Sequence, residues 1–335
     1  AVEIKVSADS SAKAVEASIP KTSISEITTK GAEAMTVNSP VAALTFDKAS
    51  LQGIANTATA DVKIAANTVE ASSLPAAAKE AIGDHPVYNF TVTSGSDTIS
   101  KFNGSVSVAI PYTLKAGEDT NAIVIYYIDG QGNLEMIKDC SYDASSGKVV
   151  FKTSHFSNYA VGYNKVSFTD VSGWSKDYVS YLAARDVIAG KSSGQFAPNA
   201  DITRAEFAQI LANLSGADLS AYSSGSFSDV KGNAWYAKAV NWAYSNGVVL
   251  GTNGKFEPNA KITRQDMALM ISRYAEKIAK YSLAQTVSKV DFSDAASISS
   301  YASEAVSAMQ QAGMISGRTG NSFAPKASAT RAETA

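Results

Sequence analysis

The phrases "ITRAEF" at 202–207, "ITRQDM" at 262–267 and "ATRAET" at 329–334 repeat one pattern three times in the second half of the chain. Each phrase contains a Thr-Arg pair followed by a carboxylate, and the arginines stand at positions 204, 264 and 331. Internal repeats this regular indicate structural units that bury one another's apolar faces. The phrase therefore predicts a series of three repeats.

Helix capping explains most of the phrase. A Thr three residues before a carboxylate is the pattern of a capping box, in which both side chains bond the free N–H groups of a helix start. The pairs are Thr203 with Glu206, Thr263 with the shorter Asp266, and Thr330 with Glu333. A Phe-x-Pro step precedes each phrase and predicts a core anchor followed by an extended entry.

Capping does not explain the three arginines. The first helical position lies at the positive end of the helix dipole, where a cation costs roughly 0.3–1 kcal/mol. An anion is therefore expected beside each guanidinium. A ligand carboxylate or phosphate fits, and so does an internal salt bridge to Asp170, Asp229 or Asp294. Spacing alone does not choose between these two interpretations.

Amphipathic helices are predicted ahead of each phrase, because apolar residues recur there at i, i+3, i+4 and i+7. The stretches are "YVSYLAARDVIAG", "WYAKAVNWAYSNGVV" and "YASEAVSAMQQAGMI". A Phe-x-Asp motif opens each repeat, which predicts repeats at 165–224, 225–289 and 290–335. The third stops within its helix-start phrase, so we expect it to be truncated and the chain to be a fragment.

Residues 1–164 contain short apolar runs separated by turn residues, a pattern typical of an antiparallel meander. The runs are "YNFTVTS", "GSVSVAIPY", "NAIVIYYIDGQGNLEMI", "CSYDASSGKVVFKTS" and "SNYAVGY". Two short helices are predicted, one capped by Asp47 and one with Pro75 near its first position. We expect a mainly β, sandwich-like spacer domain whose "DGQGN" and "DASSG" segments are hairpin loops.

Composition argues against several classes of function. The net charge of −2 and a pI near 5.8 disfavour nucleic acid as a partner. No apolar run is long enough to span a membrane. The single cysteine, Cys140, is predicted to be a packed thiol. With only His85 and His155 and no catalytic motif, the sequence predicts no enzyme activity, no metal site and no cofactor.

The repeats resemble bacterial surface-layer homology (SLH) domains, on the Phe-x-Asp-Val opening, the helix, "NGVVLGTNGKFEPNAKITRQDMALMISR" and the Thr-Arg-Ala-Glu phrase. The resemblance implies an all-α pseudo-trimer, a three-pronged spindle around a helical bundle. It also implies binding of a secondary cell-wall polysaccharide, often pyruvylated, in grooves between repeats. The ligand-binding residues implied are Arg204, Arg264, Arg331, Asp170, Asp229, Asp294, Trp174 and Trp235. The two tryptophans could equally be core residues, and Trp242 is predicted to be core.

Two departures from the repeat pattern bear on the grooves. Asp186 stands where the other repeats have Gly247 and Gly313, so the first repeat's turn is expected to differ. Tyr301 stands near the position of Trp235. We expect the groove that depends on the third repeat to be the most altered.

The sequence therefore predicts a secreted protein of the bacterial cell surface that is anchored noncovalently to the wall. Neighbouring copies of the surface protein are further candidate partners. The alternative is the anchoring tail of a secreted polysaccharide-degrading enzyme with its catalytic domain upstream. The stretch "TSHFSNYAVGY" at 153–163 also weakly resembles the self-cleaving strands of ZU5-like and GAIN-like sandwiches. We expect an intact chain, because strain is needed for cleavage as well as His155 and Ser157.

Overall fold

The computed structural model describes residues 1–223 and 225–335. Ser224, expected to be the last residue of the first repeat, lies outside the described residues. The chain divides into two compact units, Ala1–Val166 and Ser167–Ala335, and each is described by itself.

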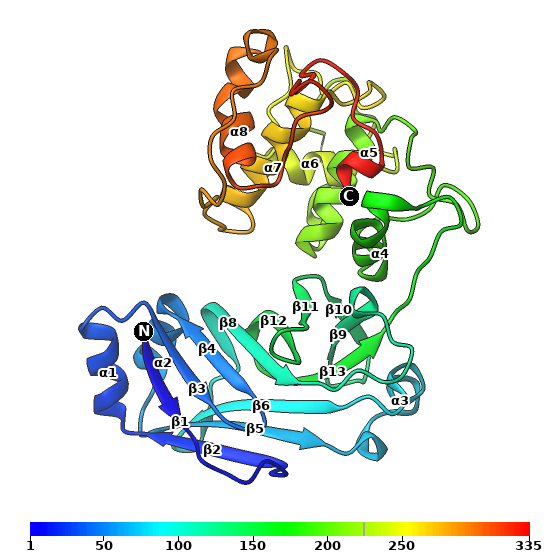
Figure 1. The fold of residues 1–335 in the computed structure, drawn as a ribbon. Helices are drawn as coiled ribbons and strands as arrows, with labels where there is room; N and C mark the ends of the chain where they lie inside the picture. The colour runs from blue at the N-terminus through cyan, green and yellow to red at the C-terminus, as the bar shows by residue number, and fades with distance from the viewer. Residues whose placement is uncertain (224) are drawn as a thin grey trace. The chain divides into compact units, whose positions relative to one another are not determined.

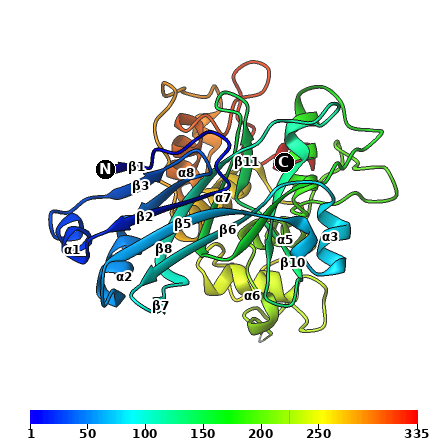
Figure 2. The same cartoon turned by 90° about the horizontal axis from the view of Figure 1, so that it is seen from below.

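The first unit is built from two β-sheets (Figure 1). One has the strand order β1-β3-β4-β8-β12-β11, and the other has the order β10-β9-β13-β6-β5-β2 with β7 paired to β6. Neighbouring strands are antiparallel except for β1 and β3. Figure 2 shows β5 and β6 side by side in the second sheet. The strands are β1 (Val2–Lys5), β2 (Ala14–Ile19), β3 (Ala34–Asn38), β4 (Ala43–Asp47), β5 (Val62–Val69), β6 (Val87–Ser94), β7 (Asp97–Thr98), β8 (Lys101–Pro111), β9 (Ile123–Ile128), β10 (Leu134–Ile137), β11 (Cys140–Asp143), β12 (Lys148–His155) and β13 (Asn158–Tyr163).

Aromatic side chains from both sheets meet in the core of this unit. Phe151 of β12 and Tyr159 of β13 have ring centroids 5.0 Å apart. Phe156 lies between the sheets, with its ring 5.8 Å from Phe46 and 5.6 Å from Phe90. Alternate residues of each strand point inward, which is why period-2 runs build this core.

Three helices complete the unit: α1 (Lys21–Thr29), α2 (Lys48–Thr57) and α3 (Ala76–Ile82). Asp47 is the N-cap of α2, as predicted, and accepts a 2.7 Å bond from the Ser50 N–H. Its other oxygen accepts from the Ser105 N–H of β8 at 2.8 Å. A Cβ on Gly104 would lie 2.1 Å from the Asp47 carboxylate, so only glycine fits there. Cys140 is buried, as predicted for a packed thiol.

The first five strands and α1 were not predicted from the sequence. These strands lie among Lys, Glu, Ser and Thr residues, and strands β1 and β2 are at sheet edges. Edge strands bury only part of one face, so the apolar alternation of β1 and β2 is weak. Strands β3, β4 and β5 lie inside the sheets and alternate buried with less buried residues, so their pattern was present in the sequence and was missed.

Among its described residues, the second unit contains five α-helices: α4 (Lys176–Ala184), α5 (Arg204–Ser215), α6 (Ala237–Ser245), α7 (Arg264–Lys277) and α8 (Ser300–Gln311). Helices α4, α6 and α8 are the predicted first helices of the repeats, and α5 and α7 follow the Thr-Arg phrase. Helix α5 packs against α6, and α7 packs against α8. In the third repeat the phrase leads into a short 3-10 turn, Ala332–Thr334.

The prediction that this half is an all-α spindle around a helical bundle is wrong. Extended segments connect the helices, and β-bridges join one repeat to the next. The bridges are Asp201 with Thr330, Thr203 with Lys261, and Thr263 with Ser328. Helical periodicity detects only the helices, whereas the extended segment before each phrase has backbone groups that require partners. The neighbouring repeats supply those partners.

Three buried residues show how the repeats join. The Ile202 N–H donates to the Ala329 carbonyl, the Ile262 N–H to the Ile202 carbonyl, and the Ala329 N–H to the Ile262 carbonyl, at 3.2, 3.0 and 2.9 Å. All three side chains are fully buried. The extended segments therefore form a closed ring of backbone hydrogen bonds, one from each repeat.

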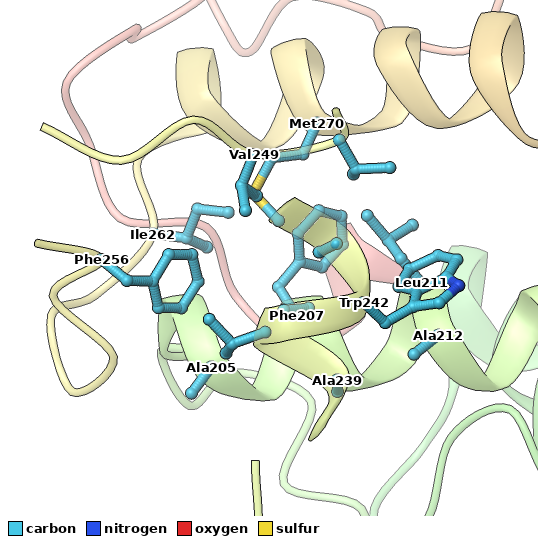
Figure 3. Packing of buried hydrophobic residues seen from close by; sticks show 14 of the residues in the cluster. Ala205, Phe207, Leu211, Ala212, Ala239, Trp242, Val249, Phe256, Ile262 and Met270 are labelled. Atoms are coloured by element: carbon cyan, nitrogen blue, oxygen red, sulfur yellow. The ribbon is translucent and has the colours of Figure 1, made fainter. Parts of the chain in front are cut away.

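Trp242 lies in the apolar core, as predicted, with 2% of its surface exposed. Figure 3 shows it near Leu211 and Ala212 of α5, in a cluster that also includes Phe207. Among the residues that the structure describes, no helix is both long and apolar enough to cross a membrane.

Candidate functional site

Each arginine of the Thr-Arg phrase reaches into another repeat. Its Nε donates to the carbonyl oxygen of that repeat's Phe-x-Pro phenylalanine, and its guanidinium lies over the phenylalanine ring. The hydrogen bonds are Arg204 to Phe256 at 2.9 Å, Arg264 to Phe323 at 2.8 Å and Arg331 to Phe196 at 2.8 Å. The distances from guanidinium carbon to ring centroid are 5.0, 5.1 and 4.4 Å. The three arginines thus mark three equivalent contacts between repeats. We name the inter-repeat grooves that the resemblance implies by these arginines, as the Arg204, Arg264 and Arg331 grooves.

The predicted aspartates hold the turns on which the arginines rest. Each carboxylate accepts from the phenylalanine N–H and from the N–H of the next residue. The pairs are Asp170 with Phe196 and Ala197, Asp229 with Phe256 and Glu257, and Asp294 with Phe323 and Ala324, all at 2.7–2.9 Å. The second residue of each pair has a left-handed φ, between 54 and 59°. The Phe196 N–H is the main cause of a lowered pKa at Asp170.

Two of the arginines are paired with a carboxylate, but not with these aspartates. Arg204 lies 3.5 Å from Asp266, and Arg264 lies 2.6 Å from Glu333. Both carboxylates belong to the Thr-Arg phrase of the next repeat. Arg331 has no ion pair within the described part of the chain; its Nη2 donates instead to the Ala189 carbonyl at 2.6 Å. The internal salt bridge therefore accounts for two arginines and leaves the third.

Arg331 lines a pocket of about 300 Å³ that is formed mostly by the first repeat, with Trp235 from the second repeat and Arg331 and Thr334 from the third. The residue is 7% exposed. Burial lowers its pKa, yet a guanidinium keeps its proton far above neutral pH. The other polar or aromatic residues of the lining are Lys191, Phe196, Glu206, Gln209, Asn213, Trp235 and Thr334. A buried cation with an aromatic wall suits an anionic, partly apolar ligand.

The aromatic residues that open the first helices lie at the surface. Trp174 and Trp235 are 66% and 64% exposed, so neither is a core residue. Tyr301 is also exposed, but its hydroxyl donates to Asp266 at 2.8 Å and accepts from Gln265 at 2.8 Å. The Arg204 groove therefore has an aromatic residue already bonded to the carboxylate that pairs with Arg204.

The turn at Asp186 does not differ from those of the other repeats. Asp186 has φ of 53°, close to the 69 and 73° of Gly247 and Gly313. Aspartate tolerates the left-handed region better than most residues. The expectation of an altered turn was therefore wrong.

Sequence reasoning missed Lys191. Its Nζ lies 2.5 Å from Glu206 and forms an ion pair with it. Glu206 holds the same position in the Thr-Arg phrase as Asp266 and Glu333 in the other repeats. The signal was available: Lys191 follows Gly190 in the turn "GKSSGQF", where the third repeat has Arg318 and the second has Thr252.

The reactive side chains of the first unit do not come together. His85 bonds to Glu118 at 3.0 Å. The His155 ring packs edge-on against Tyr127, whereas the Ser157 hydroxyl donates to the Ile128 carbonyl at 3.4 Å. No group of three His, Cys, Asp or Glu residues suited to a metal occurs in the described residues. The "DGQGN" and "DASSG" segments form hairpin turns, as predicted.

The comparisons with known proteins bear mainly on the second unit, although one alignment is long enough to extend into the first. The S-layer homology domain family matches residues 167–208, 226–268 and 291–335. An amylopullulanase of Thermoanaerobacterium thermosulfurigenes is 35% identical over 243 residues, which is 71% of this chain and 13% of that protein. The exoglucanase XynX of Acetivibrio thermocellus is 37% identical over 51% of this chain and 16% of its own length. An S-layer protein of Bacillus thuringiensis subsp. finitimus is 30% identical over 50% of this chain and 20% of its own length. The chain thus spans a fifth or less of these relatives.

Proposed function

Residues 167–335 contain three S-layer homology domains, and on this premise we propose that the chain anchors a protein noncovalently to the bacterial cell wall. S-layer homology domains bind cell-wall polysaccharide, and similar proteins include S-layer proteins. The protein is secreted and acts at the cell surface. We place the repeats at 165–224, 225–289 and 290–335, with residues 1–164 as a spacer.

The observation that supports this function most directly is the pocket of the Arg331 groove. It combines a buried guanidinium that has no ion pair among the described residues with a tryptophan that is 64% exposed. A planar fork of N–H donors matches a carboxylate. An exposed indole face offers an apolar surface for a sugar ring.

We propose that the ligand is an anionic polysaccharide that bears ketal-linked pyruvate. Its carboxylate would bind the guanidinium of Arg331, and the corresponding contacts in the other grooves would come from Arg204 and Arg264. Trp174 and Trp235 would cover the sugar. Asp170, Asp229 and Asp294 would act on the ligand indirectly, because their oxygens hold the turns whose carbonyls fix the arginines.

A second candidate function is the wall-anchoring tail of a polysaccharide-degrading enzyme. The amylopullulanase and the exoglucanase are named as enzymes, and their similarity to this chain covers 13% and 16% of their lengths. Whether the chain belongs to a surface protein or to a polysaccharide-degrading enzyme, we propose that residues 1–164 are not catalytic. Neighbouring copies of the surface protein remain proposed partners.

Sedimentation with cell-wall sacculi tests the proposal. The full chain should pellet with untreated sacculi and stay in solution with sacculi from which hot acid has removed the polysaccharide. Arg264→Lys should weaken pelleting almost as much as Arg264→Ala, because an ammonium cannot reproduce the bonds to the Phe323 and Ser316 carbonyls and to Glu333. Equal pelleting of the parent with both kinds of sacculi would contradict the function.

A further inference from the structure

We propose that the three grooves are unequal, that the Arg331 groove is the principal anion-binding groove, and that Lys191 is the residue that makes it so. This inference rests on the proposed function and assigns its anion to one place. It also predicts that the Arg204 groove contributes least.

Backbone geometry shows which residues correspond between the grooves. The N–H groups of Lys191, Thr252 and Arg318 each donate to the carbonyl of the residue that precedes the Phe-x-Pro phenylalanine. These bonds, to Gln195, Lys255 and Ser322, are 2.9, 2.9 and 2.7 Å long. The position beside the groove is therefore Lys in the first repeat, Thr in the second and Arg in the third.

The charges at these positions differ from groove to groove. The Arg331 groove has two cations, Arg331 and Lys191, with one carboxylate, Glu206. The Arg204 groove has one cation and one carboxylate, Arg204 and Asp266, because Thr252 is neutral. The positive charge of Arg204 is therefore already neutralised by Asp266. The Tyr301 hydroxyl donates a further hydrogen bond to Asp266. A carboxylate ligand would gain little there.

The Arg264 groove has two cations as well, but both are bound to one carboxylate. The Glu333 Oε1 lies 2.6 Å from Arg264 and 2.7 Å from Arg318. A ligand carboxylate would have to displace Glu333 from a buried guanidinium. Breaking this charge-assisted bond costs free energy, and that cost reduces the net gain from binding the ligand. A ligand that binds an unoccupied guanidinium nitrogen does not have this cost.

In the Arg331 groove no carboxylate among the described residues has to be displaced from the arginine, because Lys191 pairs with Glu206. One Glu206 oxygen is bound to Lys191, and the other accepts from the N–H and hydroxyl of Thr203 in the capping box. Arg331 uses its Nε and Nη2 on carbonyls, and no hydrogen bond of its Nη1 occurs in the part of the chain that the structure describes. A carboxylate can bind at Nη1 without breaking an ion pair.

Lys191 also supplies a second contact to such a ligand. Its side chain is half exposed and has a flexible stem, so its ammonium can turn from Glu206 toward an anion in the pocket. Glu206 Oε2 keeps its bonds to the Thr203 N–H and hydroxyl when this happens. Lys191 is thus a specificity-determining residue in the pocket that Arg331 and Trp235 line.

Tryptophan fluorescence and sedimentation together test the inference. The probe is polysaccharide released from untreated sacculi, added to the full chain. Trp235 lines the Arg331 groove, Trp174 is exposed elsewhere in the first repeat, and Trp242 is buried. Quenching at low probe concentration should persist in Trp174→Phe and disappear in Trp235→Phe. Lys191→Met should weaken binding to the probe and to sacculi about tenfold.

Lys255→Met is the matched control, because Lys255 is an exposed lysine in the corresponding hairpin of the second repeat. It should bind like the parent. An unchanged affinity in Lys191→Met, an equal loss in Lys255→Met, or quenching that follows Trp174 would each overturn the inference while the parent still pellets with sacculi. A parent that binds neither sacculi nor probe would instead refute the proposed function, and this inference with it.

Discussion

The Nε of Arg331 donates a 2.8 Å hydrogen bond to the carbonyl oxygen of Phe196, which lies 135 residues earlier in the chain. This bond connects the third repeat to the first, as Arg204 and Arg264 connect the first to the second and the second to the third. With the ring of Ile202, Ile262 and Ala329, it makes the three repeats one cooperative structure.

Arg331→Lys should therefore destabilise the second unit even without ligand. A lysine keeps the charge but cannot bond both carbonyls or cover the Phe196 ring, so we expect a loss of about 2–3 kcal/mol in urea unfolding. Arg318→Lys is the control, because its partly exposed ion pair with Glu333 should contribute less than about 1 kcal/mol. Similar losses of unfolding free energy in the two variants would show that the inter-repeat bonds of Arg331 stabilise the unit no more than an exposed ion pair does.

Glu257→Gly should raise stability. Glu257 is exposed and has φ of 59°, a conformation that glycine adopts without strain, so we expect a gain of about 1 kcal/mol in thermal unfolding. The same substitution at the exposed Glu304 within α8 should instead cost about 1 kcal/mol, because glycine is a poor helix former. A loss at both positions would contradict the strain assigned to Glu257.

Acid should weaken the second unit. The pKa of Asp170 is lowered by the Phe196 N–H; at Asp229 and Asp294 burial acts in the opposite direction, but hydrogen bonds still lower the pKa. A carboxyl whose folded pKa is depressed stabilises the fold above its unfolded pKa and loses that contribution as pH falls through the folded value. Unfolding free energies should thus be constant from pH 7 to about 5 and fall below about pH 4. Asp229→Asn should reduce this pH slope, and an unchanged slope would assign the acid sensitivity to other groups.

The chain should remain uncut at Phe156–Ser157. The Phe156 side chain is buried, the Ser157 hydroxyl bonds to Ile128, and neither residue has a left-handed φ. Parent and Ser157→Ala should give the same single mass after purification. A fragment that begins at Ser157 and is absent from Ser157→Ala would show a self-cleaving domain.

Local patterns in the sequence determined the repeats, their helices and the capping boxes. The Thr203–Glu206 box forms completely, with each side chain bonded to the other's backbone N–H, and the shorter Asp266 accepts no such bond from Thr263 in its phrase. These features depend on residues within four positions of one another, so spacing is sufficient to predict them.

Tertiary structure alone decided what each arginine contacts. Spacing predicted an anion at every guanidinium, but Arg204 and Arg264 meet carboxylates of another repeat, whereas Arg331 meets two carbonyls and lines a pocket. The ring of extended segments is equally invisible to periodicity. Its hydrogen bonds join residues at least 60 positions apart, and only the packing of whole repeats brings those backbones together.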